Sequence, residues 1–103
     1  MPAYLLTLTT KNVAYQLSAL VAAINAAERT QFKQVLIQGH PDNSDDVIVG
    51  DINLSETRYG YALRAYDSRL YQDSGQAGQS TADKYLMCVD TDGMKVSVEL
   101  VYH

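Results

Sequence analysis

Histidines and clustered aspartates are the side chains of this sequence best suited to acid–base chemistry or metal binding. The two histidines, His40 and His103, stand far apart, and the spacing around them supplies no converging partners for a metal site or a general base. We therefore expect His40 to be structural or solvated in its polar loop, and the terminal His103 to be solvated or frayed.

Four aspartates surround two loops in the segment HPDNSDDVIVGD: Asp42, Asp45, Asp46 and Asp51. Calcium binds carboxylate oxygens on loops, but an EF-hand requires acids at alternate positions, a central glycine and a closing glutamate, and this segment lacks that pattern. We expect solvated turns in which the aspartates bond nearby backbone groups. A weak calcium site is the alternative.

Nucleophilic chemistry has no clear centre in the sequence. Serine, threonine and tyrosine hydroxyls have no base placed to activate them, and no glycine-rich phosphate loop is present. Cys88 is the lone cysteine, which excludes an internal disulfide, and we expect it to be a small apolar residue inside a strand. We predict a non-enzymatic protein with no catalytic, cofactor-binding or metal-binding residues.

Tyrosine is the unusual feature of the composition. The chain has eight tyrosines, one phenylalanine and no tryptophan. About half should be core residues with a solvated hydroxyl, and the others are suited to a contact surface, because tyrosine offers large amphipathic area at low entropic cost. We favour a protein interface over a sugar platform, since sugar platforms usually rely on tryptophan. The predicted interface residues are Tyr59, Tyr61, Tyr66 and Tyr71.

Length and charge restrict the class of protein. A chain of 103 residues forms one domain, 1–103, with a single core, and 47% hydrophobic residues argue against disorder. The net charge of −4 and the scattered basic residues argue against nucleic-acid binding. The start of the chain lacks a targeting signal, and the apolar run from Leu17 to Ala27 is too short to span a bilayer, so we expect a cytoplasmically made, soluble protein.

The elements that must position these residues are mostly short strands. Between Lys33 and Leu63, three apolar runs are separated by residues that favour turns, as in successive strands joined by tight loops. We expect Tyr61 and Leu63 to point inward and the low-complexity segment from Ser74 to Ala82 to be a mobile surface loop. The predicted strands are 4–9, 34–38, 47–50, 59–65, 68–72, 85–90 and 94–102.

One helix is expected, from about Ala14 to Glu28. Leu17, Leu20, Val21 and Ile24 recur at helical spacing, alanines surround them, and Asn12 is the expected N-cap. The alternative is a strand from Ala14 to Leu20. The helix should dock its leucine and isoleucine face against a sheet.

The last two strands are expected to form a hairpin. Thr91-Asp92-Gly93 joins them, and Asp-Gly tolerates the positive φ of tight hairpin turns. Val96, Val98, Leu100 and Tyr102 should face the core. The whole pattern predicts a mainly β, small antiparallel β-sandwich, or a jelly-roll-like domain, with one short helix covering an edge or end.

Several short sequence patterns occur in a fixed order along the chain. They are Ile37-Gln38, Pro41-Asp42-Asn43, Val47-Ile48-Val49-Gly50-Asp51, Leu54-Ser55 and Tyr59-Gly60 before Leu63, with Leu6-Thr7-Leu8-Thr9-Thr10, Ala14-Tyr15-Gln16-Leu17 and Val89-Asp90-Thr91-Asp92-Gly93 at the two ends. In this combination the chain resembles small structural proteins in the particles of tailed bacteriophages. It departs from them at His40, where an acid is expected before the proline, and at the extra acids Asp45-Asp46.

The resemblance implies a structural role in a virion. Such proteins are often jelly-roll-like sandwiches that decorate or cement a capsid. The implied partners are the major capsid protein and further copies of the chain, as a homo-dimer or trimer, and the implied location is the virion after synthesis in the bacterial host cytoplasm. A tail or head–tail (neck) component is the first alternative. A small carbohydrate- or calcium-binding β module is the alternative of another class.

Overall fold

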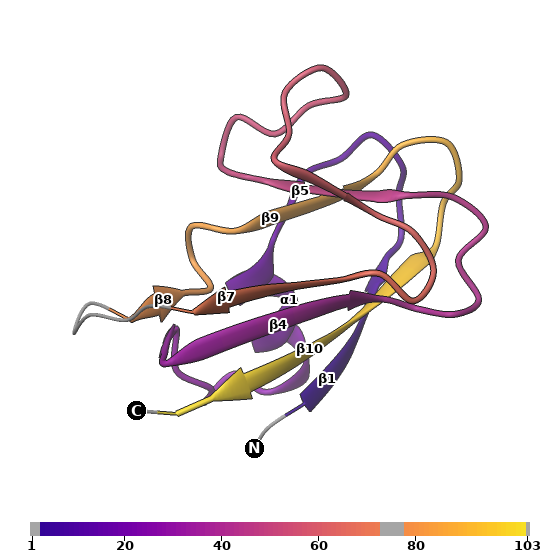
Figure 1. Cartoon of the computed structure of the whole chain (residues 1–103). Coiled ribbons are helices and arrows are strands. Elements are labelled where there is room, and N and C mark those ends of the chain that lie inside the picture. Colours follow the sequence, from indigo (N-terminus) through magenta and orange to yellow (C-terminus); the bar gives the residue numbers. More distant parts are fainter. Residues whose placement is uncertain (1–2, 73–77, 103) are drawn as a thin grey trace.

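Two four-stranded antiparallel sheets pack face to face in the computed structural model, which describes residues 3–72 and 78–102 (Figure 1). The first sheet has the order β1-β10-β4-β7, the second has the order β2-β9-β5-β6, and β3 and β8 form a small ribbon. The elements are β1 (Ala3–Leu8), β2 (Tyr15–Gln16), α1 (Leu17–Ile24), β3 (Gln31–Phe32), β4 (Gln34–Gly39), β5 (Val47–Gly50), β6 (Tyr61–Leu63), β7 (Ser68–Gln72), β8 (Gln79–Ser80), β9 (Tyr85–Cys88) and β10 (Met94–Val101).

The strand pairing follows a simple rule: the chain is one long hairpin that has been rolled up. The first strand pairs with the tenth, the second with the ninth, the third with the eighth, the fourth with the seventh and the fifth with the sixth, all antiparallel. The pairs β10–β4 and β9–β5 then join neighbouring turns of the roll into two sheets. Leaving aside the small ribbon, this order is that of a jelly roll, so the expected mainly β sandwich is confirmed.

All seven predicted strands are present, and three strands of two residues were missed. A two-residue strand carries no measurable alternation, so β2, β3 and β8 leave no pattern in the sequence. The strand β8 also corrects the expected loop from Ser74 to Ala82, because Gln79–Ser80 pairs with Gln31–Phe32 and Thr81 is buried. Residues 74–77 of that loop lie outside the described residues, as does His103.

The helix is shorter than predicted at both ends. It spans Leu17–Ile24, because Tyr15 and Gln16 pair with β9 and Asn25 adopts an extended conformation. The alternative of a strand is therefore right for two residues. Asn12 is not the N-cap, since it lies at φ 60° and donates its N–H to the Cys88 carbonyl.

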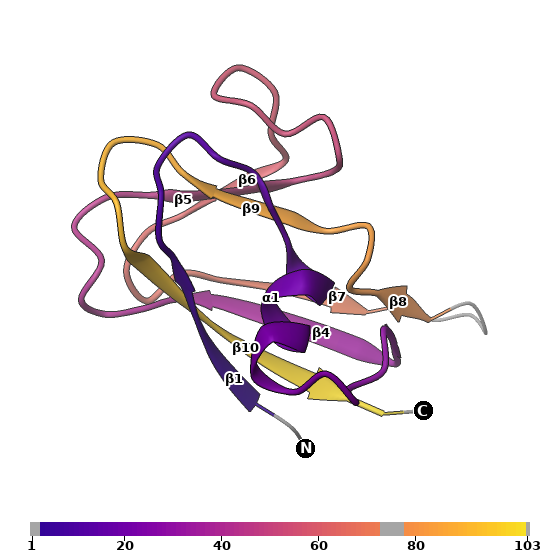
Figure 2. The same ribbon diagram turned by 180° about the vertical axis from the view of Figure 1, so that it is seen from behind.

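The helix α1 lies beside β1 and β2, at one open side of the sandwich (Figure 2). Leu17 and Val21 are buried there, whereas Ile24 is 56% exposed, which corrects the expected apolar face at its last turn. Among the described residues, no helix is long and apolar enough to cross a membrane.

The predicted hairpin between the last two long strands does not exist. β9 pairs with β2 and β5 in the second sheet, whereas β10 pairs with β1 and β4 in the first. The segment with Gly93 therefore crosses from one sheet to the other. Gly93 has the expected positive φ of 81°, but its N–H donates to the Leu8 carbonyl. A turn signal thus marked the reversal correctly and said nothing about the partner strands.

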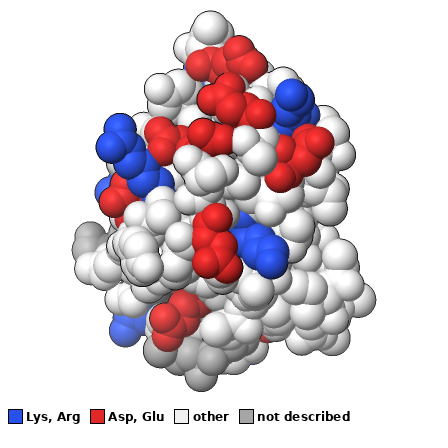
Figure 3. All heavy atoms as spheres, turned by 90° about the vertical axis from the view of Figure 1, so that its right-hand side faces the viewer, with Lys and Arg blue, Asp and Glu red and all other residues white. Residues whose placement is uncertain are grey.

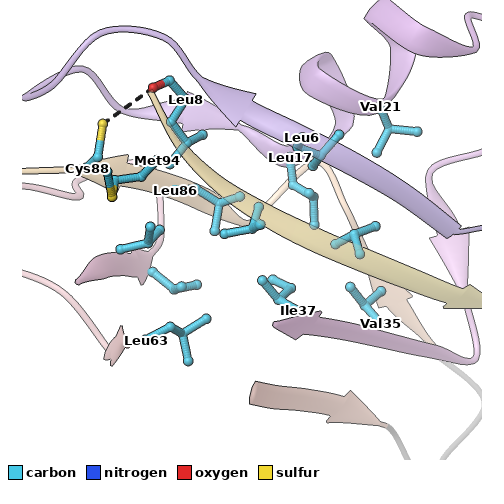
Figure 4. Packing of buried hydrophobic residues seen from close by; sticks show 14 of the residues in the cluster. Leu6, Leu8, Leu17, Val21, Val35, Ile37, Leu63, Leu86, Cys88 and Met94 are labelled. Atoms are coloured by element: carbon cyan, nitrogen blue, oxygen red, sulfur yellow. Dashed lines mark hydrogen bonds between the residues drawn. The ribbon is translucent and has the colours of Figure 1, made fainter. Parts of the chain in front are cut away.

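The core fills the space between the sheets. Alternate residues of β1, β4 and β10 point into it, which confirms the predicted inward positions Val96, Val98 and Leu100. The Cys88 thiol is buried there, as expected, and its Sγ donates to the Leu8 carbonyl oxygen at 3.5 Å (Figure 4). Burial raises the pKa of this thiol. The prediction that Tyr102 faces the core is wrong, because Tyr102 lies beyond β10 and is 41% exposed.

A second, small cluster covers the outer face of the second sheet. Ile48 and Met87 point away from the main core, and Leu54 from the 51–60 loop packs on them at 8% exposure. The β5–β6 connection therefore folds back over its own sheet. This cover buries Ile48, while its neighbours Val47 and Val49 point into the main core, so all three are buried. Ile52, in the loop itself, stays 72% exposed.

Glu28 ties three distant segments together at the end of the sandwich where both described termini lie. Its carboxylate accepts hydrogen bonds from the Tyr4 hydroxyl at 2.6 Å and from the Tyr102 hydroxyl at 3.0 Å, while the Asn25 amide donates to the Tyr4 hydroxyl at 3.2 Å. The hydrogen bond from Tyr4 lowers the pKa of Glu28 below its ordinary value. The same carboxylate raises the pKa of both tyrosines.

These shifts predict a stability that Glu28 supports at intermediate pH. The stability that comes from the lowered pKa of Glu28 is fully present above pH 4.5 and is lost as the pH falls through the folded-state pKa. The stability that comes from the raised tyrosine pKa values is fully present below pH 10.0 and is lost as the pH rises through their folded-state values. Glu28→Gln should therefore cost stability at neutral pH and progressively less outside this window. Urea unfolding at a series of pH values checks this, and a constant difference from the parent chain across the whole range would contradict it.

Candidate functional site

Two of the four predicted interface tyrosines meet at the open side of the sandwich opposite the helix. Tyr61 from β6 and Tyr71 from β7 contact edge to face, with ring centroids 6.4 Å apart. The Arg69 guanidinium lies 4.1 Å from the Tyr61 centroid and 5.2 Å from the Tyr71 centroid. The Lys84 ammonium lies 4.7 Å from the Tyr71 ring. These four residues form the cation–aromatic seam.

The cation–aromatic seam joins the two sheets. β6 is an edge strand of the second sheet and β7 is an edge strand of the first, so the stacked side chains close the gap between them. Burial raises the pKa of Tyr71. Tyr61 points toward this seam but remains 39% exposed, which corrects its expected core position. Tyr61 and Tyr71 therefore contribute first to internal packing, with cation–π contacts worth about 0.5–2 kcal/mol each.

Tyr66 stands apart from the seam and is the most exposed of the four tyrosines. Its side chain is 71% exposed, and its backbone has φ 72°, a conformation that residues other than glycine rarely adopt. The turn is held in place because the Tyr66 N–H donates to the Gly39 carbonyl at 3.1 Å and the Gly39 N–H donates to the Asp67 carbonyl at 2.8 Å. An exposed aromatic ring is thus presented on a strained, anchored turn.

Tyr59 lies at a different place, in a hollow of about 540 Å³ on the outer face of the second sheet. Ile48, Ala62 and Val89 form an apolar floor, and Arg64 contributes a basic side chain 3.6 Å from Asp46. Tyr59 is half exposed at the wall. The remaining lining residues are Asn43, Ser44, Asp45, Asp46, Glu56, Ala65 and Asp90.

Acidic side chains gather in the upper half of the face of the molecule shown in Figure 3, with basic side chains beside them. Two of the clustered aspartates accept hydrogen bonds: the Asp51 carboxylate from the Asn53 N–H at 2.8 Å, and the Asp45 carboxylate from the hydroxyl of the distant Thr91. The first of these is the expected Asx-type turn. Among the described residues, no three His, Cys, Asp or Glu side chains converge as metal ligands would. His40 Nδ1 accepts from the Asp42 N–H at 3.1 Å within its own turn.

The outer face of the first sheet is a surface that the tyrosine argument missed. Leu5 is 51% exposed and Leu70 is 43% exposed, and both stand on the phase of their strands that points away from the core. Leu36 and Val101 are partly exposed beside them. The signal in the sequence was a leucine at the outward, normally polar position of an alternating strand. This sheet-one face is defined by the outward residues of β1, β10, β4 and β7.

Fold and surface together define a small jelly roll that leaves aliphatic and aromatic side chains exposed on two separate surfaces, the sheet-one face and the Tyr66 turn. Family models, curated proteins and solved structures were all compared with the chain, and none of them matches it.

Proposed function

We propose that the chain is a non-enzymatic structural protein of a tailed-bacteriophage particle that decorates and cements the capsid. It binds the shell of major capsid protein from outside, as a homo-oligomer present in many copies. The sequence resemblance motivates this assignment, and its most characteristic stretch runs from β4 through β6.

The observation that carries the proposal is the amount of apolar and aromatic surface left exposed by a domain that has a complete core. Tyr66, Leu5 and Leu70 are each more than two-fifths exposed. On the sheet-one face, Leu70 lies next to the partly exposed Leu36, and apolar surface left exposed in this way can mark a protein contact. Jelly rolls also recur among capsid proteins, which is compatible with the role, although the fold alone carries no function.

The mechanism is added buried area between neighbouring capsid subunits. Each copy contributes a modest contact, and self-association gives adjacent copies a high effective concentration on the shell. Modest affinity per copy therefore suffices to stabilise the shell against internal pressure.

Co-sedimentation of the purified chain with full particles and with empty heads tests the proposal. We expect binding to both, with a copy number on the scale of the capsid subunits. A copy number on the scale of a single ring would place the protein at the neck or tail instead. Binding to neither would contradict a virion role altogether.

Substitutions at Tyr66 separate a binding role from a structural one. Tyr66→Gly should stabilise the fold by about 0.5–1 kcal/mol, because glycine adopts the positive φ of this turn without strain. This gain is net of the opposing effect of glycine, which adds conformational freedom to the unfolded chain. The same variant should bind particles roughly tenfold more weakly, as expected for loss of an aromatic anchor.

Ile52→Ala is the matched control, since Ile52 is 72% exposed and lies outside the predicted interface. Urea unfolding and co-sedimentation are measured on the same preparations. Particle binding that is unchanged by Tyr66→Gly would remove the Tyr66 turn from the interface.

A further inference from the structure

The sheet-one face lacks the cover that the second sheet has. In the second sheet, Leu54 from the 51–60 loop packs on the outward Ile48 and Met87. On the sheet-one face, Leu5 and Leu70 remain 51% and 43% exposed, and no described segment packs over them. The same domain thus buries the outward apolar residues of one sheet and leaves those of the other in water.

The charges on this face have an unusual arrangement. The outward positions of its four strands carry only two charged side chains, Lys95 and Glu99, and both stand on β10, one strand in from the β1 edge. The rest are aliphatic residues, alanine, serine, threonine and glutamine. Neither Lys95 nor Glu99 has an ion-pair partner among residues 3–72 and 78–102. They lie about 13 Å apart, on either side of the outward Ser97.

We propose that the sheet-one face binds a second copy of this chain, related by a twofold axis that lies in the interface and crosses β10 at Ser97. This operation reverses β10, so Lys95 of each copy faces Glu99 of the other, and the two Leu5 side chains approach each other near the axis. An axis along β10 instead places Lys95 over Lys95 and Glu99 over Glu99. The charge pattern therefore both favours one orientation and opposes the other.

The size of the face determines the strength expected of this dimer. Four strands about 4.8 Å apart and six residues long at about 3.3 Å each cover roughly 400 Å² in projection. Specific interfaces bury about 800 Å² per partner, so this contact lies at the small end and should be reversible. The inference deepens the proposed function, because it names the surface used for self-association, but the dimer forms in free protein without any particle.

Charge exchange provides the test. Lys95→Glu should weaken self-association about tenfold in sedimentation equilibrium at low salt, because it replaces two symmetric attractions by two repulsions. Glu99→Lys should do the same. The double variant Lys95→Glu/Glu99→Lys should restore the parent affinity, since it regenerates the same pairs in the opposite sense. Arg58→Glu, in the 51–60 loop on the other sheet, is the control for net charge and should leave self-association unchanged.

Each outcome decides the proposal. Restoration by the double variant supports the reversed β10 geometry. A parent chain that stays monomeric up to submillimolar concentration overturns it, as does weakening by the single variants without restoration by the double one. Circular dichroism and urea unfolding of every variant confirm that the fold is retained. Co-sedimentation with particles, measured in parallel, tests the virion role separately, so a failure of one does not count as a failure of the other.

Discussion

Gly39→Ala is expected to lower the free energy of unfolding by about 3 kcal/mol, a large effect for the addition of one methyl group. Gly39 is the last residue of β4 and is buried against the 64–67 turn. A Cβ at this position would lie 2.2 Å from the Arg64 carbonyl oxygen and 3.1 Å from its carbon. Backbone has to move to accommodate it, and the movement breaks the two hydrogen bonds that anchor the turn with Tyr66, each worth about 1 kcal/mol.

Gly60→Ala is the matched control for this prediction. A Cβ there meets only the Val49 carbonyl oxygen, at 3.4 Å, and the position is exposed, so the expected change is within about 0.5 kcal/mol. Urea unfolding followed by tyrosine fluorescence measures both variants. Equal stability of the two variants would show that the 64–67 turn relaxes freely away from β4.

Phe32→Ala is expected to lower the free energy of unfolding by about 3–5 kcal/mol. Phe32 is the one phenylalanine of the chain and is fully buried, although β3 has only two residues. Its ring stacks on the Tyr102 ring, with centroids 5.8 Å apart, and the Arg29 guanidinium lies 4.2 Å from the centroid of the Tyr102 ring. Removal of the phenyl ring leaves a cavity beside the β3–β8 ribbon and the Tyr102 ring.

An exposed apolar residue gives the comparison. Ile52→Ala removes a side chain that is 72% exposed, and the expected change is within about 0.5 kcal/mol. Chemical denaturation of both variants under identical conditions measures the difference. A loss below about 1 kcal/mol for Phe32→Ala would mean that the core collapses around the vacancy more completely than close-packed interiors usually do.

The long strands were predictable because their signal is local. Leu6 and Leu8 alternate with Leu5 and Thr7, and Val96, Val98 and Leu100 alternate with Lys95, Ser97 and Glu99, so the inward set could be named before any partner strand was known. Gly93 was identified as a turn residue for the same reason, since the positive φ that it adopts is a property of the residue itself.

The candidate site was only partly predictable. The sequence placed Tyr59, Tyr61, Tyr66 and Tyr71 within one short segment, yet the fold sends them to three places: the hollow, the seam between β6 and β7, and the 64–67 turn. Of the four, only Tyr61 and Tyr71 meet, because the segment passes from the second sheet to the first between Leu63 and Ser68 and so sets the edge strands β6 and β7 against each other. The outward Leu5 and Leu70 share one face only because four strands pair, and they lie on its opposite edges.

By itself, the sequence determined which residues of the long strands β1 and β10 point inward, where the chain reverses and that the domain is mainly β, because side-chain alternation and turn chemistry depend on neighbours along the chain. Only the tertiary structure decided which strands pair, and it placed β9 and β10 in different sheets although one turn joins them. The physical reason is that backbone hydrogen bonds in a sheet are alike at every strand, so the partner is chosen by how the whole rolled hairpin fills its core. That choice also decided which apolar face received a cover from its own chain and which face stayed exposed.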